Sequence, residues 1–90
     1  MNTHRIINGQ VCQKIVVHRF SLGDVDEPDI YAAQPIWDWQ QTEAGKFVME
    51  HAAEQPEYHQ HMDYASYRYQ YAITAWLKDR DATYFCLRWK

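Results

Sequence analysis

Two runs of aromatic and branched residues close the chain, and the polar break between them constrains the fold more than any other feature. The first run is residues 67–78, the second is residues 82–90, and the polar residues 79–81 separate them. This pattern predicts a β-hairpin with a three-residue loop. A four-residue loop would place Ile73 opposite Arg88 and scatter the apolar side chains, so consistency favours the shorter loop.

This register sorts the side chains of the hairpin onto two faces, because directly opposed residues point to the same side of a sheet. The apolar face is expected to pack on a helix and consists of Tyr71, Ile73, Ala75, Phe85, Leu87 and Trp89. The other face is aromatic and basic, and its candidate binding residues are Arg68, Trp76, Lys78, Tyr84, Arg88 and Lys90. Such a set is typical of protein-binding hot spots, and rings among cations also suit single-stranded nucleic acid.

The N-terminal part predicts one further strand. Residues 11–22 are rich in branched side chains and favour a strand, whereas residues 1–10 are expected to form a frayed or edge arm. Asn8-Gly9 is a turn signal that could make residues 5–7 a short additional strand.

The middle of the chain predicts the helical layer. Residues 35–53 are expected to form the main helix, with inward residues at the helical period: Ile36, Trp37, Ala44, Phe47 and Val48. Trp39 and Met49 lie off this stripe. Gly45 either allows a close approach of the sheet or marks a break, and Thr42 with Glu43 could cap a second helix there. One bent helix and two short helices are therefore both open.

Prolines mark the ends of this layer. Pro28 could begin a short helical turn over residues 29–33, capped by Asp26. Pro56 ends the main helix, and residues 57–66 are expected to be an irregular linker to the hairpin.

Together these elements predict a single α+β domain over residues 1–90. Ninety residues leave no room for a second core. The order β-α-β-β gives a three-stranded antiparallel sheet with a helical layer packed on one face. The pattern leaves open whether the first strand pairs with the second strand or the third.

Charge is segregated along the chain. The net formal charge is +3 over residues 1–22, −9 over residues 23–66 and +3 over residues 67–90. If the ends form the sheet and the middle forms the helices, the sheet is basic and the helical region is acidic. The simplest interpretation is that the strands and the helices attract each other across the chain, since segregated charge is common on small domains.

Only one local pattern suggests chemistry. His59, His61 and Asp63 alternate along the chain, so they can converge on one side of an extended segment and ligate a metal. The run is superficially similar to the His-x-His-x-Asp opening of the metallo-β-lactamase superfamily. However, Tyr64 stands where that motif continues with His, and the chain is far shorter than that fold requires. Solvated loop residues are therefore the expected interpretation, with no metal bound.

Other catalytic patterns are absent from the sequence. No nucleophile elbow surrounds a serine or cysteine, and no glycine-rich phosphate loop occurs. We therefore expect a protein that is not an enzyme and needs no cofactor. Cys12 and Cys86 lack close spacing and are expected to be free thiols in a reducing compartment. The alternative is a disulfide that joins the first and last predicted strands. No apolar run approaches the length of a membrane span, and the first residues lack the apolar core of a signal peptide.

Two stretches resemble small uncharacterised proteins of tailed bacteriophages. They are Val-His-Arg-Phe-Ser-Leu-Gly-Asp-Val-Asp-Glu-Pro-Asp-Ile-Tyr-Ala-Ala-Gln-Pro and Trp-Asp-Trp-Gln-Gln-Thr-Glu-Ala-Gly-Lys-Phe-Val-Met-Glu-His-Ala. The resemblance implies a viral accessory protein in the host cytoplasm, either a binder or inhibitor of a host protein or a small virion component. It carries no known activity, cofactor or site residues.

The function expected from the sequence is protein binding without catalysis, through the aromatic sheet face or the acidic helical region. A host protein or a second copy of the chain would be the partner, so a homodimer is one form of this hypothesis. Binding of single-stranded nucleic acid by the same sheet face is the alternative, and metal binding is a remote one. No membrane partner is expected.

Overall fold

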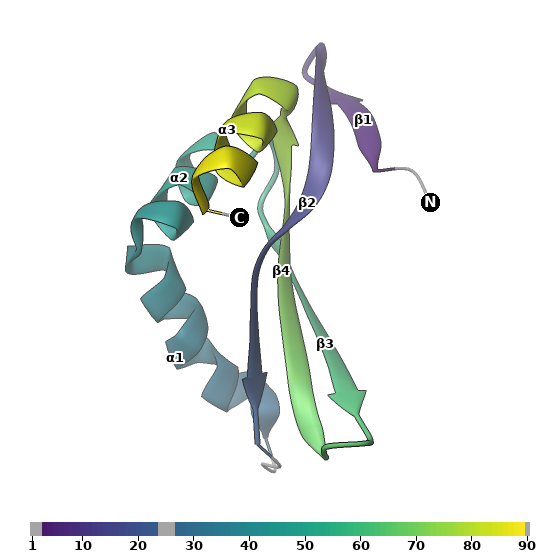
Figure 1. The fold of residues 1–90 in the computed structure, drawn as a ribbon, viewed down its shortest axis with the longest axis vertical. Coiled ribbons are helices and arrows are strands. Elements are labelled where there is room, and N and C mark those ends of the chain that lie inside the picture. The colour runs from purple at the N-terminus through teal and green to yellow at the C-terminus, as the bar shows by residue number, and fades with distance from the viewer. Residues whose placement is uncertain (1–2, 24–26, 90) are drawn as a thin grey trace.

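The computed structural model describes residues 3–23 and 27–89, which form a curled antiparallel sheet with helices on one face (Figure 1). The elements are β1 (His4–Ile7), β2 (Gln10–Leu22), α1 (Pro28–Gln41), α2 (Glu43–His51), β3 (Glu57–Asp63), β4 (Arg68–Lys78) and α3 (Asp79–Trp89). The predicted α+β class is confirmed, but the sheet has four strands rather than three. None of the described helices is both long and apolar enough to cross a membrane.

The strand order is β1-β2-β4-β3, so β2 and β4 form the centre of the sheet. They pair from Cys12 opposite Lys78 to Leu22 opposite Tyr69. The first long strand therefore lies beside the strand at residues 68–78, which answers the question of strand order. A bulge between Val16 and His18 interrupts the register, and Val17 beside it is buried in the core.

The β1–β2 turn follows the sequence signal. Asn8 and Gly9 both have positive φ angles, 52° and 79°, as a two-residue hairpin turn of the favoured twist requires. Residues 4–7 therefore form an edge strand that pairs with β2, so this part of the N-terminal arm is not frayed. Residues 1–2 lie outside the described part of the chain.

The helical region divides at Thr42, so the alternative of two helices is correct. α1 begins at Pro28, continues through Pro35 and ends at Gln41, which is longer than the short turn predicted there. Thr42 caps α2: its hydroxyl accepts a hydrogen bond from the Gly45 backbone N–H at 3.0 Å. The predicted cap of the first helix, Asp26, lies outside the described residues.

Gly45 permits the tight contact between the two helices. A Cβ at this position would overlap the Trp39 carbonyl oxygen and lie 2.7 Å from its carbonyl carbon. The residue is also buried. The sequence predicted that Gly45 would admit the sheet or mark a break, but the backbone that approaches it belongs to the end of α1.

We predict that Gly45→Ala destabilises the fold, although alanine is favoured over glycine within a helix by about 1 kcal/mol. The added methyl group must push α1 and α2 apart, so the midpoint of urea unfolding should fall. Gly23→Ala is the matched control, because a Cβ at Gly23 meets nothing within 4 Å. An unchanged or higher midpoint for Gly45→Ala would contradict the packing of the two helices.

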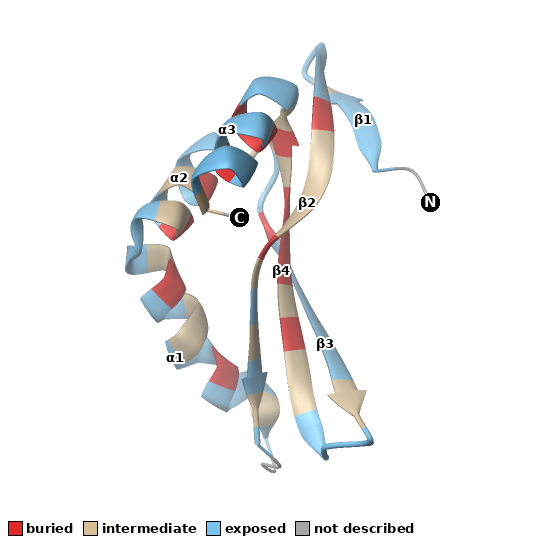
Figure 2. Cartoon of the chain, viewed as in Figure 1, coloured by how far each residue is buried: buried red, intermediate tan, exposed pale blue. Residues whose placement is uncertain are grey.

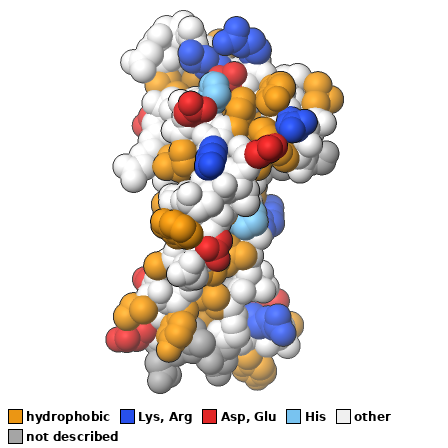
Figure 3. All heavy atoms as spheres, turned by 90° about the vertical axis from the view of Figure 1, so that its left-hand side faces the viewer, with side chains coloured by type: hydrophobic (Ala, Val, Ile, Leu, Met, Phe, Trp, Pro, Cys, Tyr) orange, Lys and Arg blue, Asp and Glu red, His pale blue; other side chains and the backbone are white. Residues whose placement is uncertain are grey.

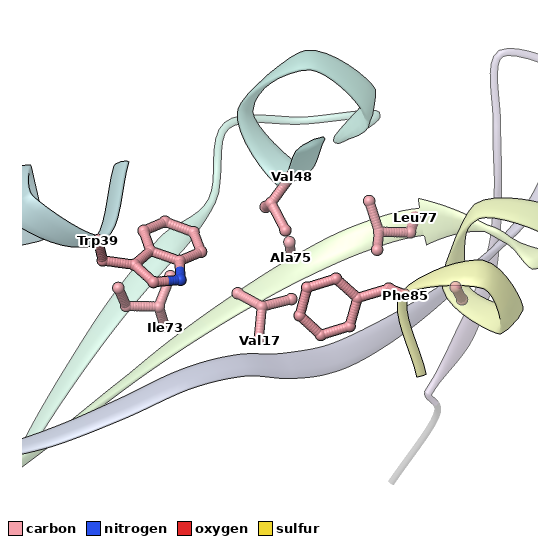
Figure 4. Close-up of a cluster of buried hydrophobic side chains, with 8 residues drawn as sticks. Val17, Trp39, Val48, Ile73, Ala75, Leu77 and Phe85 are labelled. Carbon is pink, nitrogen blue, oxygen red and sulfur yellow. The ribbon is translucent and has the colours of Figure 1, made fainter. Parts of the chain in front are cut away.

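The hydrophobic core lies between the helices and the central strands. Val17, Trp39, Val48, Ile73, Ala75, Leu77, Ala82 and Phe85 form one buried cluster, most of it shown in Figure 4. In Figure 2 the buried positions of α1, α2 and α3 lie toward the sheet. Tyr71, Ile73 and Ala75 are buried as predicted for the apolar face of β4.

The second half of the predicted hairpin is wrong, because residues 79–89 form α3. Ala82 and Phe85 are buried and Trp89 is half-buried. These positions are three and four residues apart, so they lie on one face of a helix. Leu87, predicted to face the core, is 82% exposed. Acidic residues in the first turn, Asp79 and Asp81, also suit the positive end of a helix dipole.

The predicted linker at residues 57–66 is also wrong in its first part. Residues 57–63 form β3, which pairs with β4 without a bulge from Glu57 opposite Thr74 to Asp63 opposite Arg68. This strand is polar and mostly exposed. An edge strand gains its stability from backbone pairing with its neighbour, so it needs no apolar alternation of its own.

Candidate functional site

The structure separates the six binding residues that the sequence grouped on one face. Arg68, Trp76 and Lys78 lie on β4, whereas Tyr84 and Arg88 lie on α3 in the helical layer. Lys90 lies outside the described residues. The predicted continuous aromatic and basic surface is therefore wrong, because its second strand is a helix.

Tyr84 and Arg88 contact the helical layer. The Tyr84 ring stacks on Phe47 with centroids 5.1 Å apart. The Arg88 guanidinium donates to the Glu43 carboxylate at 3.2 Å. Both contacts join α3 to α2, so these two side chains help to hold the helical layer together.

The outer face of the sheet, on the side away from the helices, carries cations and histidines. Ile73, Ala75 and Leu77 point to the core, so the alternate residues of β4 and their cross-strand partners face outward. This outer face includes Lys14, Arg19, Glu57, His59, His61, Asp63, Arg68 and Trp76. Acidic and basic side chains are mixed, so the sheet is not uniformly basic.

Trp76 on this face already has a cationic neighbour. The Arg5 guanidinium lies 4.5 Å from the centroid of its ring, and Arg5 also forms an ion pair with Glu54. One side of the indole is thus covered by β1. Lys78 is half-buried at the end of β4. It lines a cavity of about 370 Å³ together with His51 and Asp81.

A shallow pocket of about 290 Å³ lies farther along the outer face. Arg19 and His59 are the cross-strand neighbours of Ala72. The rest of the lining consists of Gln60, His61, Gln70 and Tyr71. Because Ala72 is small, it forms a low floor between longer side chains. These groups can donate hydrogen bonds to a small anion. Sequence analysis missed the pocket because it treated residues 57–66 as irregular.

The three candidate metal ligands do not converge. His59 Nε2 lies 3.0 Å from the Thr74 hydroxyl, and the Asp63 carboxylate accepts hydrogen bonds from the Ala65 N–H and the Ser66 hydroxyl. His61 borders the shallow pocket. Within residues 3–23 and 27–89, no group of three or more histidine, cysteine, aspartate or glutamate side chains is placed to hold a metal ion.

The outward face of α1 exposes large apolar side chains. Ile30 is 66% exposed and Trp37 is 56% exposed, and these residues lie two helical turns apart on one side. We call Ile30, Ala33 and Trp37 the α1 stripe. Figure 3 shows hydrophobic side chains at the surface of the helical layer, interspersed with both acidic and basic groups.

The α1 stripe reverses a prediction. The sequence placed Trp37 in the core and Trp39 off the apolar stripe, but Trp39 is 4% exposed and contributes to the core. The helix break at Thr42 is the cause. It changes the helical phase between α1 and α2, so one continuous period over residues 35–53 assigns the wrong tryptophan to the core.

Asp29 and Tyr71 fasten the first turn of α1 to the sheet. The Tyr71 hydroxyl donates to the Asp29 carboxylate at 3.0 Å, and its ring stacks on Phe20. Burial, together with this carboxylate, raises the pKa of Tyr71 to about 12 from its ordinary value of 10.0. This hydrogen bond between Tyr71 and Asp29 holds the α1 stripe in a defined position on the sheet.

We predict that the hydroxyl of Tyr71 ionises near pH 12. Absorbance at 295 nm should show one tyrosine ionising near pH 12, and Tyr71→Phe should remove that step. Asp29→Asn should move it to lower pH. Because the pKa is raised in the folded state, the stability that this group contributes is complete below pH 10.0 and declines as pH rises toward about 12. A curve unchanged by Tyr71→Phe would contradict the contact.

Comparisons with protein-family models, with curated proteins and with solved structures found no match to this chain.

Proposed function

We propose that the protein is a phage-type accessory protein that acts in the host cytoplasm as a non-enzymatic interaction module. It binds a protein partner through the α1 stripe and the acidic groups around it. The observation that supports this proposal is the exposure of Ile30 and Trp37 on one face of α1. The opposite face of the same helix is buried at Ala32 and Trp39.

The spacing of the α1 stripe suits recognition of a helix by a groove. Side chains at i, i+3 and i+7 project from one side and can enter successive pockets of a partner. Tryptophan is the residue most enriched at such contacts, since it buries a large rigid area. Trp37 is therefore the expected anchor, and Ile30 is the second contact.

The charge around the stripe indicates the chemistry of the partner. Between Arg19 and Lys46 the sequence contains six acidic residues and no lysine or arginine. Asp38, one residue from Trp37, is exposed and accepts a hydrogen bond from Gln34 at 2.8 Å. A partner groove with an apolar floor and a basic rim would complement this surface and would be steered toward it.

The fold presents the stripe on a rigid support. Trp39 is buried against the central strands at one end of α1, and Asp29 is bonded to Tyr71 near the other. A helix held at both ends loses little conformational entropy on binding, which favours affinity.

We predict that Trp37→Ala lowers the affinity for the captured host partner at least roughly tenfold, as expected for a hot-spot tryptophan. The partner would be isolated from bacterial lysate on the immobilised wild-type protein, and affinities would be measured by surface plasmon resonance. Ile30→Ala should have a smaller effect in the same direction. Leu87→Ala is the matched control, since it removes an equally apolar and 82% exposed side chain from α3. Equal binding by Trp37→Ala and Leu87→Ala would reject the α1 stripe.

The outer face of the sheet supports a second candidate function, binding of single-stranded nucleic acid. Lys14 lies opposite Trp76, and Arg19 and Arg68 lie farther along the same face. Cations around a ring are the arrangement with which sheets hold phosphates and stack bases. Glu57 and Asp63 on the same face oppose a polyanion, and Arg5 covers one side of Trp76. This candidate therefore ranks second.

We predict for this second function that a single-stranded oligonucleotide quenches the Trp76 fluorescence at low salt and that added salt reverses the quenching steeply. The variant Trp76→Phe separates this signal from the other three tryptophans. An emission spectrum that does not respond to oligonucleotide at low salt would eliminate nucleic acid as the ligand of this face.

A further inference from the structure

The edge of β3 carries acidic side chains at its two ends, Glu57 and Asp63, and none between them. The strand has seven residues, Glu57–Asp63, with no proline, no lysine and no bulge. Edge strands of stable monomers usually carry one of these devices, because their unpaired N–H and C=O groups otherwise accept another strand. About half of the residues in this strand turn those groups away from β4.

The opposite edge of the sheet is different. β1 has only four residues, and its Arg5 side chain is ion-paired with Glu54 and lies over Trp76. A strand that is short and carries a charged side chain is a poor template for pairing with a strand of another molecule. If the sheet extends, it therefore extends at β3.

The inner side of β3 is also uncovered. The helices pack on the central strands, and Tyr58 on β3 remains 39% exposed with one hydrogen bond, at 3.3 Å, to Gln40 of α1. Met62 on the same side is half-buried. An added strand would shield both the backbone edge and these side chains.

We propose that β3 pairs with β3 of a second copy of this chain, which gives a homodimer with one continuous sheet. A two-fold axis perpendicular to the sheet makes the two strands antiparallel and keeps both helical layers on the same side. This inference goes beyond the proposed function and uses a different surface.

Charge and existing side-chain contacts distinguish three registers of the two strands, centred on His59, Gln60 and His61. An axis at Gln60 would place Glu57 opposite Asp63 of the second copy twice, and directly opposed like charges destabilise a sheet. An axis at His61 would place Asp63 opposite His59 of the second copy. The Asp63 carboxylate already accepts hydrogen bonds from Ala65 at 3.1 Å and Ser66 at 3.0 Å in the following turn. An axis at His59 places Glu57 opposite His61 of the second copy twice. The contacts of the Glu57 carboxylate in its own chain are longer than those of Asp63, at 3.7 Å to Lys14 and 3.4 Å to His59, and its side chain is 55% exposed. Of these three registers, the structure therefore favours the axis at His59.

Sedimentation equilibrium of the full chain tests the pairing with a charge exchange. His61→Glu places a glutamate opposite Glu57 of the other copy at two symmetric positions in the interface. The repulsion should raise the dissociation constant of the dimer roughly tenfold. The double variant Glu57→Lys with His61→Glu restores opposite charges and should return the constant to within about threefold of wild type. A wild-type protein that stays monomeric up to about 1 mM overturns the proposal.

Two control variants identify other routes of association. Ile6→Glu alters the exposed edge of β1, and Trp37→Glu alters the α1 stripe. Neither should change the dissociation constant of the dimer. If either variant dissociates the dimer and His61→Glu does not, the proposed interface is wrong. A loss of partner binding by Trp37→Glu with the dimer intact would separate this inference from the proposed function.

Cysteine cross-linking locates the axis directly. Cys86 is exposed and Cys12 is buried, so a Cys86→Ser background removes the accessible thiol. In this background His59→Cys should form a disulfide between copies at least about tenfold faster than Gln60→Cys or His61→Cys, because only residues on the axis face their own counterparts within bonding reach. Fastest cross-linking at Gln60 or His61 would overturn the register, and equal slow rates at all three would overturn the interface.

Discussion

The pairing of β2 with β4 is the interaction on which the rest of the structure depends. Both strands are long, and together they run from Cys12 opposite Lys78 to Leu22 opposite Tyr69. A ribbon of two strands is not stable alone, because only one layer of side chains would be buried. The three helices supply the second layer, and β1 and β3 extend the ribbon on its two sides. Each surface discussed above is therefore defined by its position relative to this ribbon.

The elements that sequence reasoning predicted correctly are those with strong local signals. The alternation of β4 placed Ile73 and Ala75 in the core, and the Asn8-Gly9 pair marked the β1–β2 turn. Such patterns arise from one residue and its near neighbours, so they can be read without tertiary structure. The α+β class follows from them.

The errors arise where tertiary contacts override the local pattern. Residues 82–89 contain aromatic and branched side chains that favour strands, but burial of Ala82 and Phe85 against the core selects a helix. β3 is polar, and only its pairing with β4 makes it a strand. As a result Tyr84 and Arg88 were assigned to the sheet, and the pocket around Ala72 was not predicted at all.

The two proposed interaction surfaces lie close together, and this proximity has a consequence for binding. Gln40 on α1 is bonded to Tyr58 on β3, so the α1 stripe borders the strand at which a second copy would pair. A dimer with its axis perpendicular to the sheet would present two α1 stripes on the same side. A partner with two equivalent sites could then engage both stripes, and the second contact would form at a high effective concentration. Modest affinity at each stripe would in that case suffice for stable capture, which suits a domain too small to bury one large interface.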